Sequence, residues 1–198
     1  MSESPGASSS DGVNAIPPAA QQSILIVHAH PAPHISRANR ALAEAANSLP
    51  AVTVHEIYND YPGMFIDVRH EQELLLAHDI VVLQHPFYWY SMPALLKEWV
   101  DLVLEHGWAY GPGGERLVGK TWSHAISTGG ASDTYCATGS NRYPIDDYLR
   151  PLEQTARLCR MRWCEPFISH APRVLGDAEL AVEAGRYCRW LDQLRSGS

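Results

Sequence analysis

The sequence predicts an α/β domain built on a doubly wound parallel sheet, and three observations lead to this fold class. Short apolar runs alternate with helical stretches from Ser23 onward. Residues 24–27 are apolar throughout, which is typical of a strand buried on both faces. The connections are short, so five β-α units return parallel strands to one sheet with helices on both faces. The 198 residues suit one such domain with a tail.

The first half of the domain begins with the strand at residues 24–27. Ser36 is placed to cap a helix that runs to about Asn47, and Pro50 follows its end. Residues 52–58 alternate in polarity and are β-branched, which predicts a strand nearer the sheet edge. A helix over 69–77 and a third strand over 80–83 follow.

The second half begins with a helix at Pro93, where a missing N–H costs nothing in the first turn. The glycine-rich residues 111–114 break the chain before a fourth strand near 121–127. A long loop then leads to Arg142. The remaining predicted elements are a helix around 146–157, a fifth strand near 163–169 and a final helix over 177–195.

Composition narrows the function classes. The net charge of −7 and the pI near 5.8 argue against nucleic acid or an anionic membrane surface as the main partner. A local group of arginines is interpreted as a solvated face; its members are Arg150, Arg157, Arg160 and Arg162. The four cysteines form no C-x-x-C pair, which favours a reduced, cytoplasmic compartment.

The first 22 residues are rich in Ser, Gly, Pro and Ala, with neither a basic nor an apolar region of a signal peptide. We interpret residues 1–22 as a disordered tail and residues 23–195 as the folded domain. No apolar run approaches the ~18 residues that span a bilayer.

Residues 28–39 follow the first strand and offer imidazole, hydroxyl, guanidinium and amide donors around a helix N-terminus. The N-terminus of a helix readily binds phosphate, although neither the dinucleotide fingerprint nor the P-loop motif is present here. Two alternatives stay open. His28, His30 and His34 have the spacing of a zinc site, though no Asp or Glu lies between His28 and Glu44. The histidines are otherwise incidental to a capped helix.

The second loop follows the third strand and carries four consecutive aromatic residues, numbers 87–90, between Pro86 and Pro93. Consecutive loop residues cannot all point into one core, so some of these rings are expected to face a crevice or solvent. Aromatic faces stack on planar ligands. Taken alone, the run is a weak signal, because core packing accounts for one or two of the rings.

The third loop begins at Ser127 and contains the pair Gly129 and Gly130. Paired glycines let backbone amides approach a ligand and hold negative charge, although a plain turn explains them too. The carboxyl ends of parallel strands form the ligand crevice of such sheets. A phosphate seat, an aromatic platform and an amide-rich loop together fit flavin mononucleotide (FMN) best. FAD is less favoured, because the chain shows one anion seat and no separate adenine-binding feature.

At these residues the chain resembles the flavodoxin-like NAD(P)H:quinone oxidoreductases of the DT-diaphorase group. It most resembles the ancillary subunits of glutathione-gated potassium efflux systems (the KefF/KefG type). The segments that carry the likeness are ILIVHAHPAPHISRAN, QHPFYWYSMPALLKEWVD, HGWAYGPGG, GK and STGG. The resemblance implies a flavodoxin-like fold with strand order 2-1-3-4-5, a homodimer, and a flavin at the dimer seam.

The resemblance also implies roles for individual residues. The phosphate and ribityl end of the flavin would be held by His30, Ser36, Arg37, Ala38 and Asn39. The isoalloxazine ring would be lined by Pro86, Phe87, Tyr88, Trp89 and Tyr90, and its pyrimidine edge by Ser127, Thr128, Gly129 and Gly130. Tyr135 would be catalytic, and Trp108 and Tyr110 would approach the substrate side from the other subunit.

One position departs from the family pattern. Relatives carry a histidine six residues after the tyrosine that matches Tyr135, and this chain has Asn141 there. A neutral amide cannot supply a proton as an imidazolium can, which puts the proton relay in doubt. Transfer of hydride is not affected, because the flavin carries that chemistry.

Three functions are compatible with these residues and with the resemblance. The first is a flavoenzyme that passes hydride from NADH or NADPH to a quinone in a two-electron, ping-pong cycle. The second is a regulatory subunit that binds the cytosolic face of a potassium efflux antiporter, at the inner face of the membrane. The third is a zinc hydrolase built on His28, His30 and His34.

The helix after Pro93 has a wide apolar surface, which predicts a dimer. Its apolar residues are Leu95, Leu96, Trp99, Leu102 and Val103.

Overall fold

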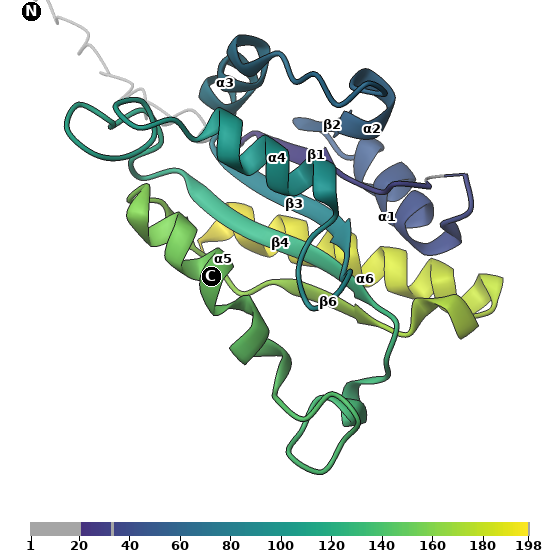
Figure 1. Cartoon of the computed structure of the whole chain (residues 1–198). Helices are drawn as coiled ribbons and strands as arrows, with labels where there is room; N and C mark the ends of the chain where they lie inside the picture. The colour runs from purple at the N-terminus through teal and green to yellow at the C-terminus, as the bar shows by residue number, and fades with distance from the viewer. Residues whose placement is uncertain (1–20, 33, 198) are drawn as a thin grey trace, which may run out of the picture.

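A six-stranded parallel sheet runs through the middle of the computed structural model, which describes residues 21–32 and 34–197 (Figure 1). The sheet order is β2-β1-β3-β4-β5, and β6 also pairs with β4, so the predicted order 2-1-3-4-5 is confirmed. The strands are β1 (Ile24–His28), β2 (Val52–Glu56), β3 (Ile80–Pro86), β4 (Thr121–Thr128), β5 (Arg162–Trp163) and β6 (Phe167–His170). The predicted tail, residues 1–22, lies outside the described residues except for Gln21 and Gln22.

Helices cover both faces of the sheet, as the doubly wound fold predicts. The helices are α1 (Arg37–Asn47), α2 (Ile57–Asp60), α3 (Val68–Ala77), α4 (Ala94–Val103), α5 (Ile145–Leu158) and α6 (Asp177–Ser196), with 3₁₀ turns η1 (Ser132–Thr134) and η2 (Pro172–Val174). One face packs against α1 and α6, and the other against the helices α2 to α5. The segment between β4 and α5 extends away from the sheet (Figure 1).

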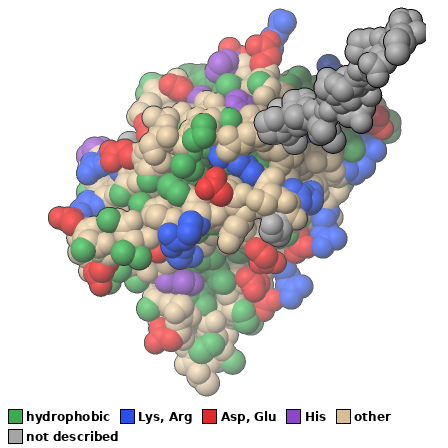
Figure 2. Space-filling model, turned by 180° about the vertical axis from the view of Figure 1, so that it is seen from behind, with side chains coloured by type: hydrophobic (Ala, Val, Ile, Leu, Met, Phe, Trp, Pro, Cys, Tyr) green, Lys and Arg blue, Asp and Glu red, His purple; other side chains and the backbone are tan. Residues whose placement is uncertain are grey.

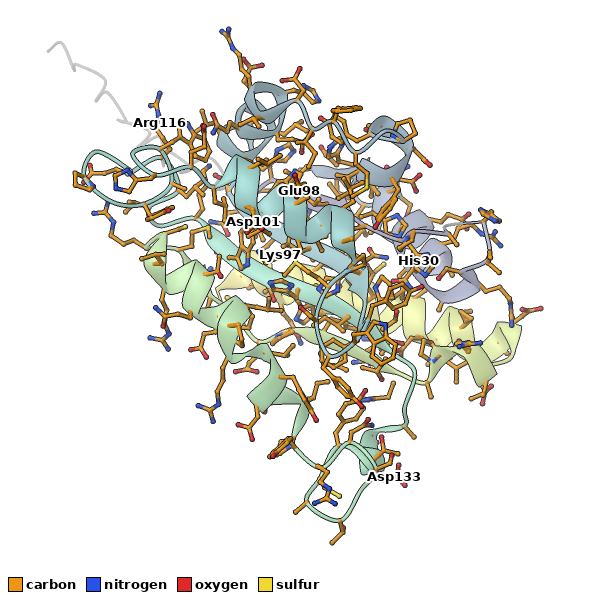
Figure 3. The ribbon with its side chains drawn as sticks, in the orientation of Figure 1. His30, Lys97, Glu98, Asp101, Arg116 and Asp133 are labelled. Atoms are coloured by element: carbon orange, nitrogen blue, oxygen red, sulfur yellow. The ribbon has the colours of Figure 1, made fainter. Side chains whose placement is uncertain are left out.

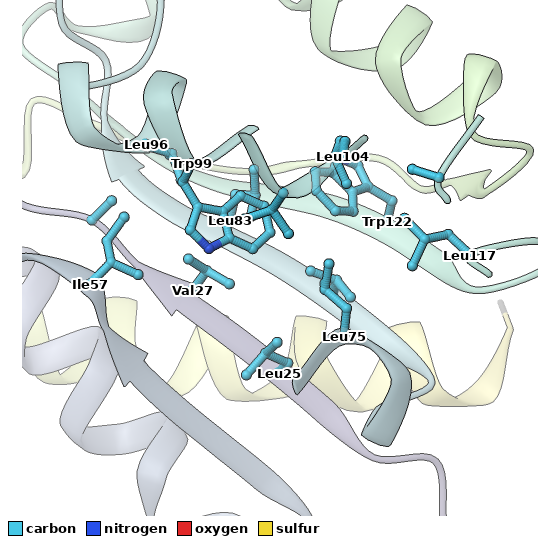
Figure 4. Close-up of a cluster of buried hydrophobic side chains, with 14 of the residues drawn as sticks. Leu25, Val27, Ile57, Leu75, Leu83, Leu96, Trp99, Leu104, Leu117 and Trp122 are labelled. Carbon is cyan, nitrogen blue, oxygen red and sulfur yellow. The ribbon is translucent and has the colours of Figure 1, made fainter. Parts of the chain in front are cut away.

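The larger core lies on the face covered by α3 and α4. Trp99 of α4 and Trp122 of β4 have their ring centroids 6.5 Å apart, and aliphatic side chains of β1 and β3 surround them (Figure 4). The strands β1, β3 and β4 are buried along their whole length, whereas β2 at the sheet edge is only partly buried. This contrast confirms the predicted positions of the first and second strands.

The second strand ends earlier than predicted. Ile57 and Tyr58, expected in the strand, begin α2 instead. Ile57 turns into the core, and the hydroxyl of Tyr58 accepts a hydrogen bond from the amide of Leu95 at the start of α4. These tertiary contacts outweigh the local β-propensity of the segment.

The fifth strand, predicted near 163–169, is interrupted. β5 ends at Trp163 and β6 begins at Phe167. Between them the hydroxyl of Ser123 donates to the carbonyl of Cys164, and Pro166 has no N–H to add to a ladder. Both short strands pair in parallel with β4, so the interruption leaves the topology unchanged.

Charged side chains of both signs are interspersed on the face seen from behind in Figure 2. The predicted arginine group follows the same pattern. Arg150, Arg157 and Arg160 are exposed and each lies beside a carboxylate, as the solvated-face interpretation expects. Among the described residues, none of the helices has the length and apolar character needed to cross a membrane.

Candidate functional site

A cleft of about 490 Å³ opens at the carboxyl ends of β1, β3 and β4. Figure 3 shows His30 at this end of the sheet, beside the start of α1. The cleft is lined by His30, Ala32, Ile35, Ser36, Arg37, Ala38, Asn39, Pro86, Phe87, Tyr88, Ser127, Thr128, Gly129, Pro172 and Arg173. Its size falls in the ~300–1,000 Å³ range of small-molecule sites. The three loops that the sequence indicated therefore meet at one place.

The first wall of the cleft is the N-terminus of α1. Ser36 is the N-cap, as predicted, and its hydroxyl oxygen accepts from the amide of Asn39 at 3.3 Å. No acidic residue lies in the first turn of α1. The positive end of the helix dipole thus faces the cleft without a carboxylate from its own first turn, which suits an anion.

His30 presents a neutral N–H donor to the cleft. Its Nδ1 accepts a hydrogen bond from the amide of Ala32 at 3.1 Å, which leaves the proton on Nε2. Burial, together with the neighbouring His28, lowers the pKa of His30 to about 4. The ring is therefore uncharged at neutral pH and donates through Nε2.

Asn39 links the first and third loops. Its side-chain amide donates to Ser36 Oγ at 3.1 Å and to Ser127 Oγ at 2.9 Å. Because both hydroxyl oxygens act as acceptors here, their O–H groups stay available to donate to a ligand. The Oδ1 of Asn39 is buried, and no protein hydrogen-bond partner for it is found among the described residues. The two serine hydroxyls are therefore free to donate to a polar group bound in the cleft.

The two arginines of the cleft differ in their interaction partners. Arg37, predicted to hold the phosphate, contacts Asp177 at 2.5 Å and the carbonyl of Leu175, both near the start of α6. Arg173, on η2, lines the cleft and is exposed, and within the described residues it is found in no ion pair. The structure therefore adds a cation that the sequence patterns did not indicate.

The aromatic run divides between two environments. Phe87 and Tyr88 line the cleft, whereas Trp89 is 92% exposed and lies outside the lining. Trp89 and Tyr90 both have positive φ, and the amide of Ser91 donates to the carbonyl of Tyr88, so these residues form a tight turn. Left-handed backbone is unusual for bulky residues and is found most often at functional loops. Two of the four rings, rather than all of them, meet the cleft of the same chain.

Tyr90 lies against the long loop before α5 instead of the cleft. Its ring stacks on Tyr148 with centroids 5.0 Å apart, and its hydroxyl donates to Asn141 Oδ1 at 3.3 Å. The amide of Asn141 donates in turn to Thr134. Asn141, at the family's histidine position, thus joins the two loops.

The glycines of the third loop have different surroundings. A Cβ atom on Gly129 would meet nothing within 4 Å, consistent with its place on the open cleft. A Cβ atom on Gly130 would lie 2.7 Å from Thr134 Oγ1 and 3.0 Å from Asn141. Gly129 leaves room for a ligand, whereas a side chain at Gly130 would displace Thr134 or Asn141.

Tyr135, predicted to be catalytic, is not among the residues that line the cleft. Its ring is 5.6 Å from that of His170, at the end of β6, and burial raises the pKa of its phenol. His170 Nδ1 is 3.1 Å from Thr128 Oγ1, which itself donates to the carbonyl of Gly130. An imidazole therefore does lie beside Tyr135, and it comes from a strand that no sequence pattern connected with the site.

Trp108 and Tyr110 are not brought to this cleft. They pack against the core in the loop between α4 and β4, and this loop joins the amino ends of the strands. Figure 3 shows Arg116 of the same loop and His30 at opposite ends of the sheet. A substrate-side role for Trp108 and Tyr110 would therefore require a second subunit.

The three histidines of the zinc hypothesis are not gathered into a ligand set. His28 Nδ1 lies 3.4 Å from Glu56, and His34 is exposed. Among the residues that the structure describes, no group of three His, Cys, Asp or Glu side chains is arranged to hold a metal ion.

Four cleft residues were not predicted from the sequence: Ala32, Ile35, Pro172 and Arg173. The first two lie within the loop that follows the first strand, which was predicted to border the site. Pro172 and Arg173 follow the last strand, and only the rule that every carboxyl end of a parallel strand borders the crevice points to them.

Three comparisons place the chain among known proteins. Residues 22–191 match the family model described as Flavodoxin-like fold. The chain is 53% identical over 168 residues to the glutathione-regulated potassium-efflux system ancillary protein KefG of Pectobacterium atrosepticum, covering 85% of this chain and 92% of that protein.

Solved structures agree with the fold. The general stress protein 14 of Treponema denticola, in complex with FMN, has a TM-score of 0.82 at 39% identity and covers 87% of this chain and 99% of its own. An NADPH-quinone reductase from P. pentosaceus has a TM-score of 0.78 at 29% identity, with coverages of 85% and 96%. The chain therefore belongs to the flavodoxin-like NAD(P)H:quinone oxidoreductase family, among the relatives of the KefG-type ancillary proteins.

Proposed function

We propose that the protein is an FMN-dependent NAD(P)H:quinone oxidoreductase that carries two electrons from NADH or NADPH to a quinone in a ping-pong cycle. The observation that carries the proposal is the cleft itself. Its lining combines the start of α1, the Nε2–H of His30 and Arg173 with the rings of Phe87 and Tyr88. An anion-binding end joined to an aromatic wall matches a phosphorylated flat ring. Relatives titled as FMN complexes or quinone reductases support the same assignment.

A bound flavin supplies the two-electron chemistry, and the chain supplies binding and orientation. His30, Ser36 and Arg173 would hold the phosphate, and Asn39 would keep Ser36 and Ser127 oriented toward the cleft. Gly129 leaves space for the ring edge.

FMN is favoured over FAD because the described cleft has a single anion-binding end. The test is to release the cofactor from purified protein by heat and to identify it by chromatography and mass. FMN in about equimolar amount is expected. FAD would correct the cofactor, and protein that neither retains nor takes up flavin would reject the proposal.

The reaction is tested with the flavin-loaded protein under anaerobic conditions. Oxidation of NADH or NADPH should depend on an added quinone, and the initial rates should give parallel double-reciprocal lines. A protein that binds FMN but oxidises neither nucleotide would be a flavin-binding protein without this activity.

A second function is favoured by the KefG likeness, which spans 92% of that relative. We propose that the protein also acts as an ancillary subunit of a potassium efflux antiporter, in the cytoplasm and at the inner face of the membrane. Co-purification with the antiporter encoded nearest to its gene, and a change in potassium efflux on its deletion, are expected. Unchanged efflux in the deletion strain would remove this role and leave the enzyme proposal intact.

A further inference from the structure

Two buried histidines lie beneath the cleft, on the sheet face covered by α4 and α5. His85 is near the end of β3, and His124 is in the middle of β4; both are almost completely inaccessible to solvent. Their rings are nearly perpendicular, and His85 Nε2 lies 3.1 Å from His124 Nδ1. Neither one is part of the cleft lining.

The neighbours of the two histidines determine which ring nitrogen of each one carries the proton. The indole N–H of Trp122 can only donate, and it lies 3.1 Å from His124 Nε2. A neutral His124 must then carry its proton on Nδ1 and donate it to His85 Nε2. His85 in turn carries its proton on Nδ1 and donates to the carbonyl oxygen of Pro86 at 3.0 Å.

The chain of hydrogen bonds requires both rings to be neutral. Burial lowers the pKa of each, and the further influence on His124 is only the other histidine. The other rings packed against His124 are those of Trp122 and Trp163, and Trp163 also packs against the apolar cluster that holds Leu149 and Leu152 of α5. Every ring nitrogen of the two histidines has a partner, which is the condition under which a buried polar network fixes one geometry.

The last acceptor belongs to the cleft. The carbonyl oxygen of Pro86 also accepts from the amide of Tyr88 at 3.1 Å, and the amide of Phe87 donates to the carbonyl of Ser127 at 2.8 Å. His85 therefore holds the turn at which β3 leaves the sheet. Pro86, Phe87 and Tyr88, the three residues after it, all line the cleft.

We infer that His85 and His124 are positioning residues: the chain Trp122–His124–His85 holds the Pro86 carbonyl and so sets Phe87 and Tyr88 against a flat ligand ring. The inference rests on the proposed function, since that ring belongs to the flavin. Aliphatic side chains would fill the same space but could not orient this carbonyl.

The first test uses the protein without flavin. Nitrogen-15 NMR of the histidine side chains should show His85 and His124 in the Nδ1–H form from pH 7 to pH 5. An Nε2–H form of His85, or protonation of either ring near pH 6.5, would overturn the inference.

The second test compares His85→Asn with His85→Gln. The asparagine amide reaches the position of Nδ1 and can still donate to Pro86, whereas the glutamine amide reaches the position of Nε2 and cannot. The FMN dissociation constant should stay near that of the wild type in His85→Asn and rise about two- to tenfold in His85→Gln, the range expected for one net hydrogen bond. His70→Gln, an exposed histidine of α3, is the control and should change nothing.

Unfolding of both variants in urea separates positioning from stability. If His85→Asn and His85→Gln lose FMN affinity to the same extent, and also lose stability to the same extent, the histidines only fill the core. The inference would then fail. If the wild type binds no flavin, the proposed function fails, and the NMR result alone then decides whether the chain of hydrogen bonds exists.

Discussion

At the scale of single residues, Glu71 of α3 is a fully buried carboxylate with three hydrogen-bond donors around it. Its side chain has no exposed surface and accepts from His55 Nε2 at 2.8 Å, from Trp99 Nε1 at 2.7 Å and from the hydroxyl of Tyr61. Burial alone would raise the pKa of Glu71, but these hydrogen bonds hold it below its usual value. Burial would likewise lower the pKa of His55, whereas Glu71 and Asp60 raise it. The two groups form a buried ion pair.

Glu71→Ala should lower the free energy of unfolding by about 3–5 kcal/mol, because it leaves the His55 imidazolium and two further donors without their acceptor. Urea unfolding at pH 7 measures the loss. Glu73→Ala, which removes an exposed carboxylate from the same helix, is the control and should be nearly neutral. A loss no greater in Glu71→Ala than in the control would contradict the ion pair.

Arg173 is the residue through which the cleft's anion-binding end can be tested. Arg173→Glu places a carboxylate at the end where the phosphate is proposed to bind, so the FMN dissociation constant should rise at least tenfold, as expected for a lost charge-assisted hydrogen bond of about 1.5–3 kcal/mol. Arg189→Glu makes the same charge change on an exposed residue of α6 and should leave the affinity unaltered. Equal effects of the two variants would indicate long-range charge alone.

At the scale of elements, the strands and the crevice loops could be predicted because apolar runs and the topology of parallel sheets determine them. Continuous apolar residues identified β1 and β3, and the three predicted loops do meet at the cleft. The direction of consecutive loop rings could not be predicted, because it depends on the positive φ of Trp89 and Tyr90. The early end of β2 likewise depends on a contact with Leu95, far away in the sequence.

Two loops of the site are held together by aromatic contacts. Tyr90 of the turn after β3 stacks on Tyr148 of α5, and the hydroxyl of Tyr148 donates to the carbonyl of Asn141. The long segment between β4 and α5 otherwise extends from the sheet, with Asp133 near its tip (Figure 3). We expect this stack to limit local opening of the segment.

Tyr148→Ala should speed amide hydrogen exchange in residues 131–143 by up to about tenfold, because an aromatic pair contributes ~0.5–1.5 kcal/mol. Tyr148→Phe is the matched variant: it keeps the stacked ring, loses only the hydroxyl, and should show a smaller change. Mass spectrometry of exchanged peptides measures both. If the alanine variant leaves exchange in this segment unchanged, the stack does not hold the loops together.

At the scale of the whole molecule, the buried histidines make stability depend on pH. Burial lowers the pKa of His85 from 6.5 to about 4, and that of His124 lies well below its usual value. The unfolded chain therefore binds protons below pH 6.5 that the folded chain does not. The contribution of these two histidines to stability is complete above pH 6.5 and falls as the pH drops toward 4, and His85 alone accounts for about 3 kcal/mol of the loss.

Urea unfolding at pH 7, 6 and 5 should show this decline before the carboxylates titrate. The decline should be less steep in His85→Leu, which removes one of the groups that bind a proton in the unfolded chain but not in the folded chain. His55 has the opposite effect on stability. Its pKa is raised in the folded chain, so its contribution to stability is present in acid and is lost as the pH rises. A pH dependence of unfolding that is the same in His85→Leu as in the wild type would show that the His85 ring is not kept neutral.

The assembly state depends on which apolar side chains remain exposed on the single chain. The structure buries four of the five apolar residues of α4 in the core of the same chain and leaves only Leu102, 39% exposed, so α4 offers less partner surface than predicted. The most exposed of the large apolar side chains lie in loops, with Phe65 at 90% and Trp89 at 92% exposure. Large exposed rings of this kind favour an interface.

We therefore still expect a homodimer, with Phe65 and Trp89 in its interface instead of most of α4. Light scattering of the flavin-loaded protein at micromolar concentration should give twice the chain mass of 21.9 kDa. Phe65→Asp should shift the mass toward the monomer without loss of helical circular dichroism, whereas Val182→Asp, at an exposed position of α6, should not. A wild type that is monomeric with flavin bound would remove the dimer. It would also remove the substrate-side role of Trp108 and Tyr110, because their own chain holds both residues away from the cleft.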